Sequence, residues 1–278
     1  MTTRYEDVLI AAIASAIQAD TASLRPVFSE LPHDDAQLFS LFDTVSPDAD
    51  ALDFSTVFGQ ILTAQPPSPL LSVAKQNFAQ PSNWLTAGTR QIAKYAPTRS
   101  DIVQSIDTGP SIEHRFDGHG QEDARGLSGL TVSDAGFRLL PRGVDWTNAR
   151  IQSLKLDLRH VALTPIRQGA WFNQGVFAMA HSNQQWVPNP THTTWDSVFG
   201  PEGALQRVPT SVLVGSGLDL QITITSEDEW DVVIPPEWPL AKAVTTTADM
   251  TVTITVTTTP SEPLLLGLQD QAVADLLG

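Results

Sequence analysis

Apolar residues in the first third of the chain recur every three or four positions, which is the spacing of amphipathic helices. The pattern predicts a short helix after a turn at Pro32, and longer helices over residues 4–19, 54–64, 69–79 and 82–94. The stretch QPPSP and Pro97 interrupt this pattern, because proline cannot continue a helix. Residues 1–97 are therefore expected to form a helical region.

Alternation of apolar and polar residues replaces the helical spacing after Asn148. The stretches IQSLKLDLRHVAL, TSVLVGSGLDLQITITS and AVTTTADMTVTITVTTTP each predict one β-strand. A change of phase at Arg159–His160 predicts a β-bulge in the first of them. The last two strands carry threonine on one face, and we expect these faces to lie side by side, because Thr–Thr pairs favour neighbouring strands of an antiparallel sheet.

These patterns predict an α+β fold with three parts. An N-terminal helical region, 1–97, packs on a C-terminal antiparallel β-sandwich-like domain, 149–278. Glycines break any periodicity between them, so residues 98–148 are expected to be an irregular connector with short strands. The closing apolar residues predict a short C-terminal helix over 263–277.

The balance of charge narrows the choice of partners. The 278 residues include 31 acidic against 16 basic side chains, giving a formal net charge of −15. No basic run is present, so binding to nucleic acid or to an anionic lipid surface is not expected. The absence of cysteine removes disulfide frameworks and thiol chemistry.

The N-terminal stretch has acidic residues close to its start and no basic segment before an apolar one, so it does not predict a signal peptide. No run of eighteen apolar residues occurs, so no stable membrane span is expected. We therefore expect a protein that is cytoplasmic at synthesis. Export by a route that reads no N-terminal signal is left open.

The stretch IEHRFDGHGQED contains the best local candidate for a metal site. Its carboxylates and imidazoles are suitable ligands for a divalent ion, and its glycines would let a loop wrap around one. The spacing matches no defined metal motif. The candidate ligands are Glu113, His114, Asp117 and His119. Apart from such a metal, no cofactor is expected.

No catalytic residue is predicted. The chain has no G-x-S-x-G elbow, and Ser216, between two glycines, is expected in a link between strands. No phosphate-binding glycine loop is present. An active site assembled from distant residues would leave no local motif, so a hydrolase stays open as an alternative.

Tryptophans interleaved with amide and hydroxyl side chains mark a second candidate region. Trp171, Trp186 and Trp195 lie within one such segment. Aromatic rings beside amides suit a core with its covering loop, a protein interface or a sugar-binding face. All three interpretations stand at this level.

The threonine-rich strand offers a further surface, represented by Thr251, Thr253 and Thr255. It also has the alternation of a membrane-inserting hairpin, but its nearest upstream partner strand lies beyond a charged, proline-rich connection, which disfavours a simple inserting hairpin. Its lack of charge would let a partner strand add at an edge.

We therefore expect a non-catalytic interaction or assembly protein of a bacterial pathway, acting through a protein partner or self-association. The first alternative is a metal-dependent or other hydrolase that uses residues 113–123. The second is a toxin-like or carbohydrate-binding β-protein.

Overall fold

A computed structural model describes residues 5–45, 52–84, 93–117, 149–226, 241–246, 251–258 and 263–277. The fold is mixed α+β, as predicted, and the chain divides into two compact units that interleave along the sequence. Unit 1 comprises Met1–Leu31, Val103–Leu163 and Leu213–Leu268, and unit 2 comprises Pro32–Ile102, Thr164–Val212 and Gln269–Gly278. Each unit thus contains segments from both sides of the predicted connector. None of the described helices is long and apolar enough to cross a membrane.

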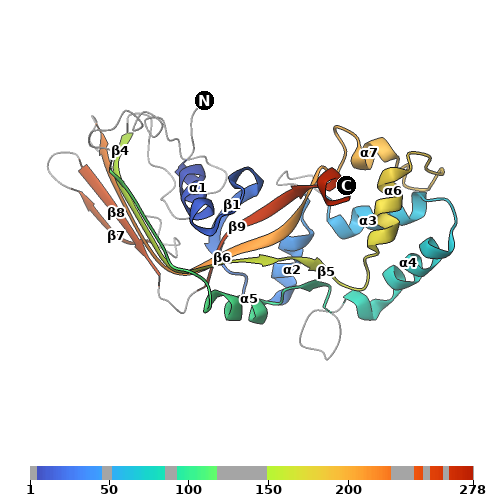
Figure 1. Ribbon diagram of the computed structural model, residues 1–278, viewed down its shortest axis with the longest axis horizontal. Coiled ribbons are helices and arrows are strands. Elements are labelled where there is room, and N and C mark those ends of the chain that lie inside the picture. The colour runs from blue at the N-terminus through green and yellow to red at the C-terminus, as the bar shows by residue number, and fades with distance from the viewer. Residues whose placement is uncertain are drawn as a thin grey trace. The chain divides into compact units, whose positions relative to one another are not determined.

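A seven-stranded sheet contains all but two of the described strands (Figure 1). Its main path runs in the order β1-β9-β6-β4-β3, while β8 pairs with β6 and β7 pairs with β8. The strands are β1 (Leu24–Glu30), β3 (Ile112–Asp117), β4 (Ala149–Pro165), β6 (Arg207–Ser226), β7 (Ala241–Thr246), β8 (Thr251–Thr257) and β9 (Pro263–Ala272). The sandwich arrangement is not confirmed, since the remaining described strands, β2 (Tyr95–Ala96) and β5 (Arg167–Gln168), form only a two-stranded ribbon.

The threonine rows of the sheet follow the predicted pairing. Strands β6 and β8 are antiparallel, and Thr223 pairs with Thr253 while Thr225 pairs with Thr251. Strand β7 extends the first row by pairing Thr245 with Thr253. Alternation in the sequence therefore predicted that the threonine faces of these two strands lie side by side.

The prediction of a single strand over residues 243–260 is wrong, because the stretch forms two paired strands, β7 and β8. The nearest upstream partner of β8 is therefore β7, which lies only a few residues before it in sequence, and not the strand beyond the charged, proline-rich connection. Strand β8 has neighbours on both sides, so its backbone offers no free edge to a partner. The neighbouring edge is β7, whose register shift at Ala241/Ala243 leaves Lys242 as the extra residue; a bulge with a lysine discourages edge pairing.

The predicted change of phase in β4 is visible in its burial. Leu156 and Leu158 are buried, and the next buried residue is Val161 rather than His160. Gly109 approaches β4 at this point, because a Cβ on it would lie 2.1 Å from the Val161 carbonyl oxygen. His160 is held there by a hydrogen bond between its Nδ1 and the Gly109 carbonyl, 3.0 Å apart.

Strand β6 runs through the stretch that was expected to link two strands. Ser216 lies inside it and is 3% exposed. Gly217 follows with φ of 61°, a conformation that glycine adopts readily. The link predicted at Ser216 is therefore wrong, since pairing with neighbouring strands carries the chain through both glycines.

The C-terminal helix is shorter than predicted. Residues 263–272 form strand β9, whose buried residues run without interruption from Leu264 to Leu268, and only Val273–Leu277 form helix α8. A strand that is buried on both faces has a continuous run of apolar residues in its sequence. Apolar spacing alone does not distinguish such a run from a buried helix.

The helices described before residue 80 form where the apolar spacing predicts, whereas the helices at 99–106, 174–182 and 195–199 were not predicted. They are α1 (Tyr5–Ile17), α2 (Asp35–Asp43), α3 (Phe54–Ala64), α4 (Pro69–Ala79), α5 (Arg99–Ile106), α6 (Gln174–Ser182) and α7 (Trp195–Phe199), with short 3-10 turns at Thr21–Ser23 and Pro81–Trp84. The helix predicted over 82–94 is wrong at both ends, because Pro81–Trp84 is a 3-10 turn and Tyr95 begins strand β2 after residues outside the described part. The strands predicted at 130–132 and 137–140 also lie outside it.

Trp171 is the centre of the core of unit 2. It is 0% exposed, stacks on Trp84 with ring centroids 5.0 Å apart, and donates its indole N–H to the Lys94 carbonyl at 2.7 Å. Its ring also contacts Phe58 and Tyr95 edge-on. Helices α3, α4 and α6, which lie close to one another in Figure 1, each bury apolar side chains and contact one another.

Replacing this ring should therefore destabilise the protein. Trp171→Ala is expected to lower the free energy of unfolding by about 3–5 kcal/mol, the usual cost of removing a buried aromatic ring. Urea unfolding followed by circular dichroism measures the change. Val73→Ala, at a residue 50% exposed, is the control and should change stability by no more than about 0.5 kcal/mol. Equal effects of the two substitutions would contradict the central role of Trp171.

Candidate functional site

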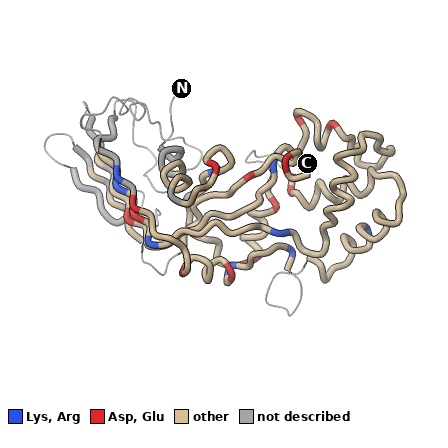
Figure 2. Tube along the Cα trace, in the orientation of Figure 1, with Lys and Arg blue, Asp and Glu red and all other residues tan. Residues whose placement is uncertain are grey.

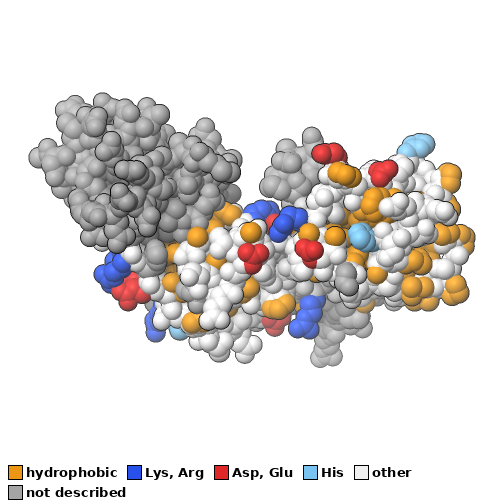
Figure 3. Space-filling model, turned by 45° about the horizontal axis from the view of Figure 1, so that its top comes forward, with side chains coloured by type: hydrophobic (Ala, Val, Ile, Leu, Met, Phe, Trp, Pro, Cys, Tyr) orange, Lys and Arg blue, Asp and Glu red, His pale blue; other side chains and the backbone are white. Residues whose placement is uncertain are grey.

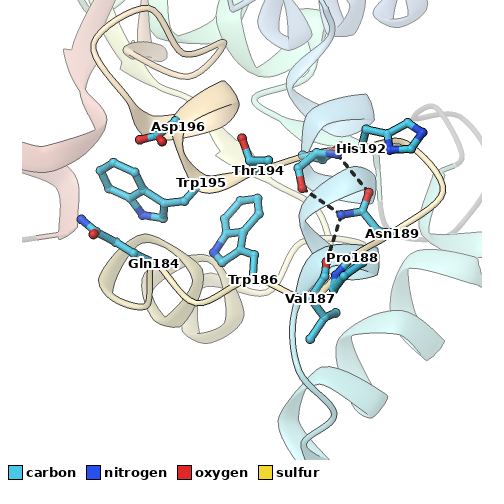
Figure 4. A pocket seen from close by; sticks show the side chains of 10 residues that line it. Gln184, Trp186, Val187, Pro188, Asn189, His192, Thr194, Trp195 and Asp196 are labelled. Atoms are coloured by element: carbon cyan, nitrogen blue, oxygen red, sulfur yellow. Dashed lines mark hydrogen bonds between the residues drawn. The ribbon is translucent and has the colours of Figure 1, made fainter.

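A groove of about 580 Å³ in unit 2 is the candidate binding site (Figure 4). It lies along the segment that joins α6 to α7, and its size falls in the range of about 300–1,000 Å³ that small-ligand sites occupy. It is lined by Gln184, Trp186, Val187, Pro188, Asn189, His192, Thr193, Thr194, Trp195 and Asp196.

Two half-buried indole rings form one part of the groove, and both are anchored through their N–H groups. Trp186 donates to the carbonyls of Ala180 and Asn183, at 3.2 and 2.8 Å. Trp195 donates to the carbonyl of His181 at 2.8 Å. The last carbonyls of a helix have no partner within it, so the two tryptophans complete the C-terminal end of α6.

Phe199, at the end of α7, packs against both indoles from within the unit. Its ring centroid lies 6.0 Å from that of Trp186 and 6.1 Å from that of Trp195. His181 lies 5.1 Å from the same phenylalanine in an edge-on arrangement. The indole positions are thus fixed by packing as well as by hydrogen bonds, and Figure 4 shows Trp186 and Trp195 beside each other.

The opposite part of the groove is a loop that Asn189 holds in shape. Its amide nitrogen donates to the carbonyls of Val187 and Thr193, and its oxygen accepts from the Thr193 N–H and the Thr191 hydroxyl. The Val187 N–H also donates to the carbonyl of Ala64, at the end of α3. The Asn189 side chain is therefore committed to the loop and leaves little capacity for a ligand.

Charge is scarce around the groove. From Gln168 to Trp195 the chain contains no Asp, Glu, Lys or Arg, and Asp196 is the one such residue among those lining the groove. Figure 2 shows α3, α4 and α6 almost free of charged residues. On the described face in Figure 3, acidic and basic side chains are scattered rather than gathered into a patch of one sign. No Lys or Arg lines the groove to attract a phosphate or another anion.

A separate polar cluster in unit 2 surrounds Asp43, which is 1% exposed. One carboxylate oxygen accepts from the Ser55 N–H at 2.8 Å and the Tyr95 hydroxyl at 2.6 Å. The other accepts from the Ser55 hydroxyl and the Lys94 ammonium, both at 2.6 Å. Four donors from two separate segments thus meet on one buried carboxylate.

The surroundings of Asp43 alter two neighbouring titratable groups. Burial raises the pKa of Tyr95 well above its usual value, and the charge of Asp43 raises it further. Burial also raises the pKa of Asp53, as does the negative charge of Asp43, while the Lys94 ammonium opposes the rise.

The Asp43 cluster is not arranged as a catalytic site. A carboxylate has about four acceptor positions, and all four of Asp43 are occupied, so it has no free position for a substrate proton. Ser55 donates to this carboxylate rather than to a free base. In the described residues, the buried Ser216 hydroxyl makes no hydrogen bond, so it has no activating base either. Both serines are better explained as parts of the core.

The predicted metal ligands lie partly outside the described residues. Glu113 is exposed on β3, and its carboxylate pairs with Arg115. The side chains of His114 and Asp117, and the whole of His119, are outside the described part. Within that part, no three acidic or histidine side chains come together as ligands for a metal. The metal site stays a prediction.

The predicted interaction residues separate into three settings. Trp171 is fully buried, so it belongs to the core and not to a surface; this corrects its place in the candidate set. Trp186 and Trp195 line the groove. Thr253 and Thr255 are half-buried on β8 in unit 1. The side chain of Thr251, on the same strand, is not among those that the structure describes.

Sequence reasoning missed Gln184, His192 and Asp196 at the groove, and it missed the Asp43 cluster. The absence of charge from Gln168 to Trp195 is the signal that could have singled out the groove segment. No comparable signal exists for Asp43, whose partners Ser55 and Lys94 are distant in sequence.

Comparison with known proteins adds no functional assignment. No protein-family model matches the chain, and no curated protein matches its sequence.

Removing the charge of Asp43 should destabilise unit 2. Asp43→Asn leaves the Lys94 ammonium beside a neutral amide, and breaking such a buried pair costs about 3 kcal/mol or more. Urea unfolding at neutral pH measures the loss. Tyr95→Phe, which removes a single hydrogen bond to the same carboxylate, should cost only about 1 kcal/mol. If the two variants lose the same stability, the ion pair is not what makes Asp43 important.

Asp53 predicts a pH dependence. Its pKa is higher in the folded than in the unfolded chain, so ionisation costs the native state free energy as pH rises through the folded pKa. Asp53→Asn should therefore be more stable than wild type at pH 7. The difference should shrink as pH falls through the folded pKa and disappear well below about 4, the unfolded pKa of an aspartate, where Asp53 is protonated in both states. Asp107→Asn, at an exposed aspartate, is the control, and a gain for Asp53→Asn that persists at low pH would refute the argument.

Proposed function

We propose that this chain is a non-catalytic interaction protein and that the groove of unit 2 is its recognition site. The observation that carries the proposal is the pair of half-buried indoles, Trp186 and Trp195, whose donors are committed to α6 while their rings line an open groove. Tryptophans in such settings dominate the binding energy of many interfaces.

Rigidity supports the same proposal. The indoles are fixed by α6 and Phe199, and the facing loop is fixed by Asn189. A site that is ordered before binding loses less conformational freedom when a ligand arrives. The groove can therefore bind its partner without first being assembled.

The hydrolase and toxin-like alternatives have less support. A metal-dependent hydrolase would need ligands from residues 113–123, where the one described carboxylate side chain, that of Glu113, is paired with Arg115. A toxin-like action would rest on strands β6, β7 and β8, whose threonine rows pair with one another within one sheet. Both alternatives, together with self-association and synthesis in the cytoplasm, remain predictions. The acidic composition supports a partner other than nucleic acid.

A photo-crosslinking residue placed in the groove tests this function. Incorporated at Pro188, an exposed residue that lines the groove, it should trap one reproducible partner in extracts of the source organism. The matched control places the same residue at Val73, an exposed position on α4 that does not line the groove. Trp195→Ala combined with the Pro188 crosslinker should abolish the product because it removes the ring that anchors the partner.

Two outcomes would contradict the proposal. The first is equal crosslinking from Val73, which would indicate a partner that does not use the groove. The second is a product at Pro188 that persists in the Trp195→Ala variant. Light scattering during size-exclusion chromatography then shows whether the trapped partner is a second copy of the chain.

A further inference from the structure

The donor positions of the groove limit which ligands can use its tryptophans. The indole N–H of Trp186 is shared between two carbonyls, and that of Trp195 is bonded to the carbonyl of His181. Neither N–H is free to donate to the carbonyl of a peptide. The part of each side chain that can still contact a ligand in the groove is therefore its aromatic ring.

A sugar ring is a ligand that can bind to such aromatic rings. One face of a pyranose presents C–H groups, which carry slight positive charge and suit the negative face of an aromatic ring. Its edge presents hydroxyl groups, which both donate and accept hydrogen bonds. Recognition then requires polar side chains beside the aromatic face.

The groove supplies such side chains around Trp195. Gln184 and Asp196 are exposed and lie on either side of this indole in Figure 4, and the exposed His192 lies farther along the loop. The amide of Gln184 donates and accepts, while the carboxylate of Asp196 accepts from sugar hydroxyls. The Asn189 amide, by contrast, is occupied within its own loop.

The charges of the groove residues favour neutral sugars over anionic ones. No Lys or Arg lines the groove, and its one fully charged side chain is the carboxylate of Asp196 in a protein of net charge −15. Uronic acids, sulfated sugars and phosphorylated sugars would meet repulsion without a compensating cation. A neutral sugar meets no such cost.

We propose that the groove binds a neutral glycan, with a sugar ring stacked on Trp195 or Trp186 and hydroxyl groups hydrogen-bonded to Gln184 and Asp196. This inference rests on the proposed function and names the chemistry of its ligand. The glycan is either a free polysaccharide or the sugar of a glycosylated partner, and both present the same ring to the groove.

Isothermal titration with defined ligands tests the inference. The neutral probes are the hexasaccharides of cellulose, chitin, starch and β-mannan; the others are heparin, oligogalacturonate, oligoproline and oligoarginine. At least one neutral hexasaccharide should bind, and Trp195→Ala should weaken that binding at least about tenfold, as expected for the loss of a central aromatic anchor. Trp195→Phe keeps a ring face without the N–H and should retain more affinity than Trp195→Ala.

Controls separate binding from folding. Each variant is compared with wild type by thermal unfolding, and Val73→Ser provides a surface variant away from the groove whose affinity should be unchanged. Gln184→Ala should weaken binding of the neutral glycan, because the sugar hydroxyls lose the amide with which they form hydrogen bonds. If the partner trapped from extracts is a glycoprotein, enzymatic removal of its glycans should abolish its crosslink at Pro188, whereas a free polysaccharide should compete for the same position.

The outcomes distinguish this inference from the proposed function. If no neutral hexasaccharide binds while the Pro188 crosslink still depends on Trp195, the glycan inference is overturned and the interaction function stands. Preferential binding of oligoproline, oligoarginine or a charged glycan overturns it as well. If the crosslink itself does not depend on Trp195, the proposed function fails first.

Discussion

The buried carboxylate of Asp43 is the constraint on which unit 2 depends. Its acceptor positions gather Ser55, Lys94 and Tyr95 from separate segments. The carbonyl of Lys94 in turn accepts from Trp171, which fixes the ring that fills the core. Helix α6 packs on that core, and the groove is built from the segment that follows α6. A buried charge without these partners would be strongly unfavourable, so the segments must come together in one arrangement.

Local periodicity was sufficient for much of the fold. The bounds predicted for α3 and α4, 54–64 and 69–79, are the bounds observed, because apolar spacing and flanking prolines act over a few residues. The pairing of threonine rows on β6 and β8 was also predictable, since alternation fixes which residues share a face.

Other features depend on contacts distant in sequence. An apolar run such as that of Leu264–Leu268 is compatible with helix or strand, and pairing with β1 and β6 decides for the strand. The sequence identified the tryptophan segment as a candidate site, but it did not show which of the rings are buried. Trp171 is buried by α3 and α4, which are distant in sequence, whereas Trp186 and Trp195 line the groove. Gln184, His192 and Asp196 belong to no sequence motif, and polar residues of these types are common in loops, so the sequence did not mark them as part of a site.

The two indoles that complete the end of α6 have a consequence for the dynamics of the unit. The same side chains form the wall of the groove and satisfy the last carbonyls of the helix. Fraying of the last turn of α6 would release the indoles, so the intact groove and the intact helix end are a single cooperative state. A ligand that binds only this state would therefore slow hydrogen exchange in the last turn of α6, even at amides that it does not touch.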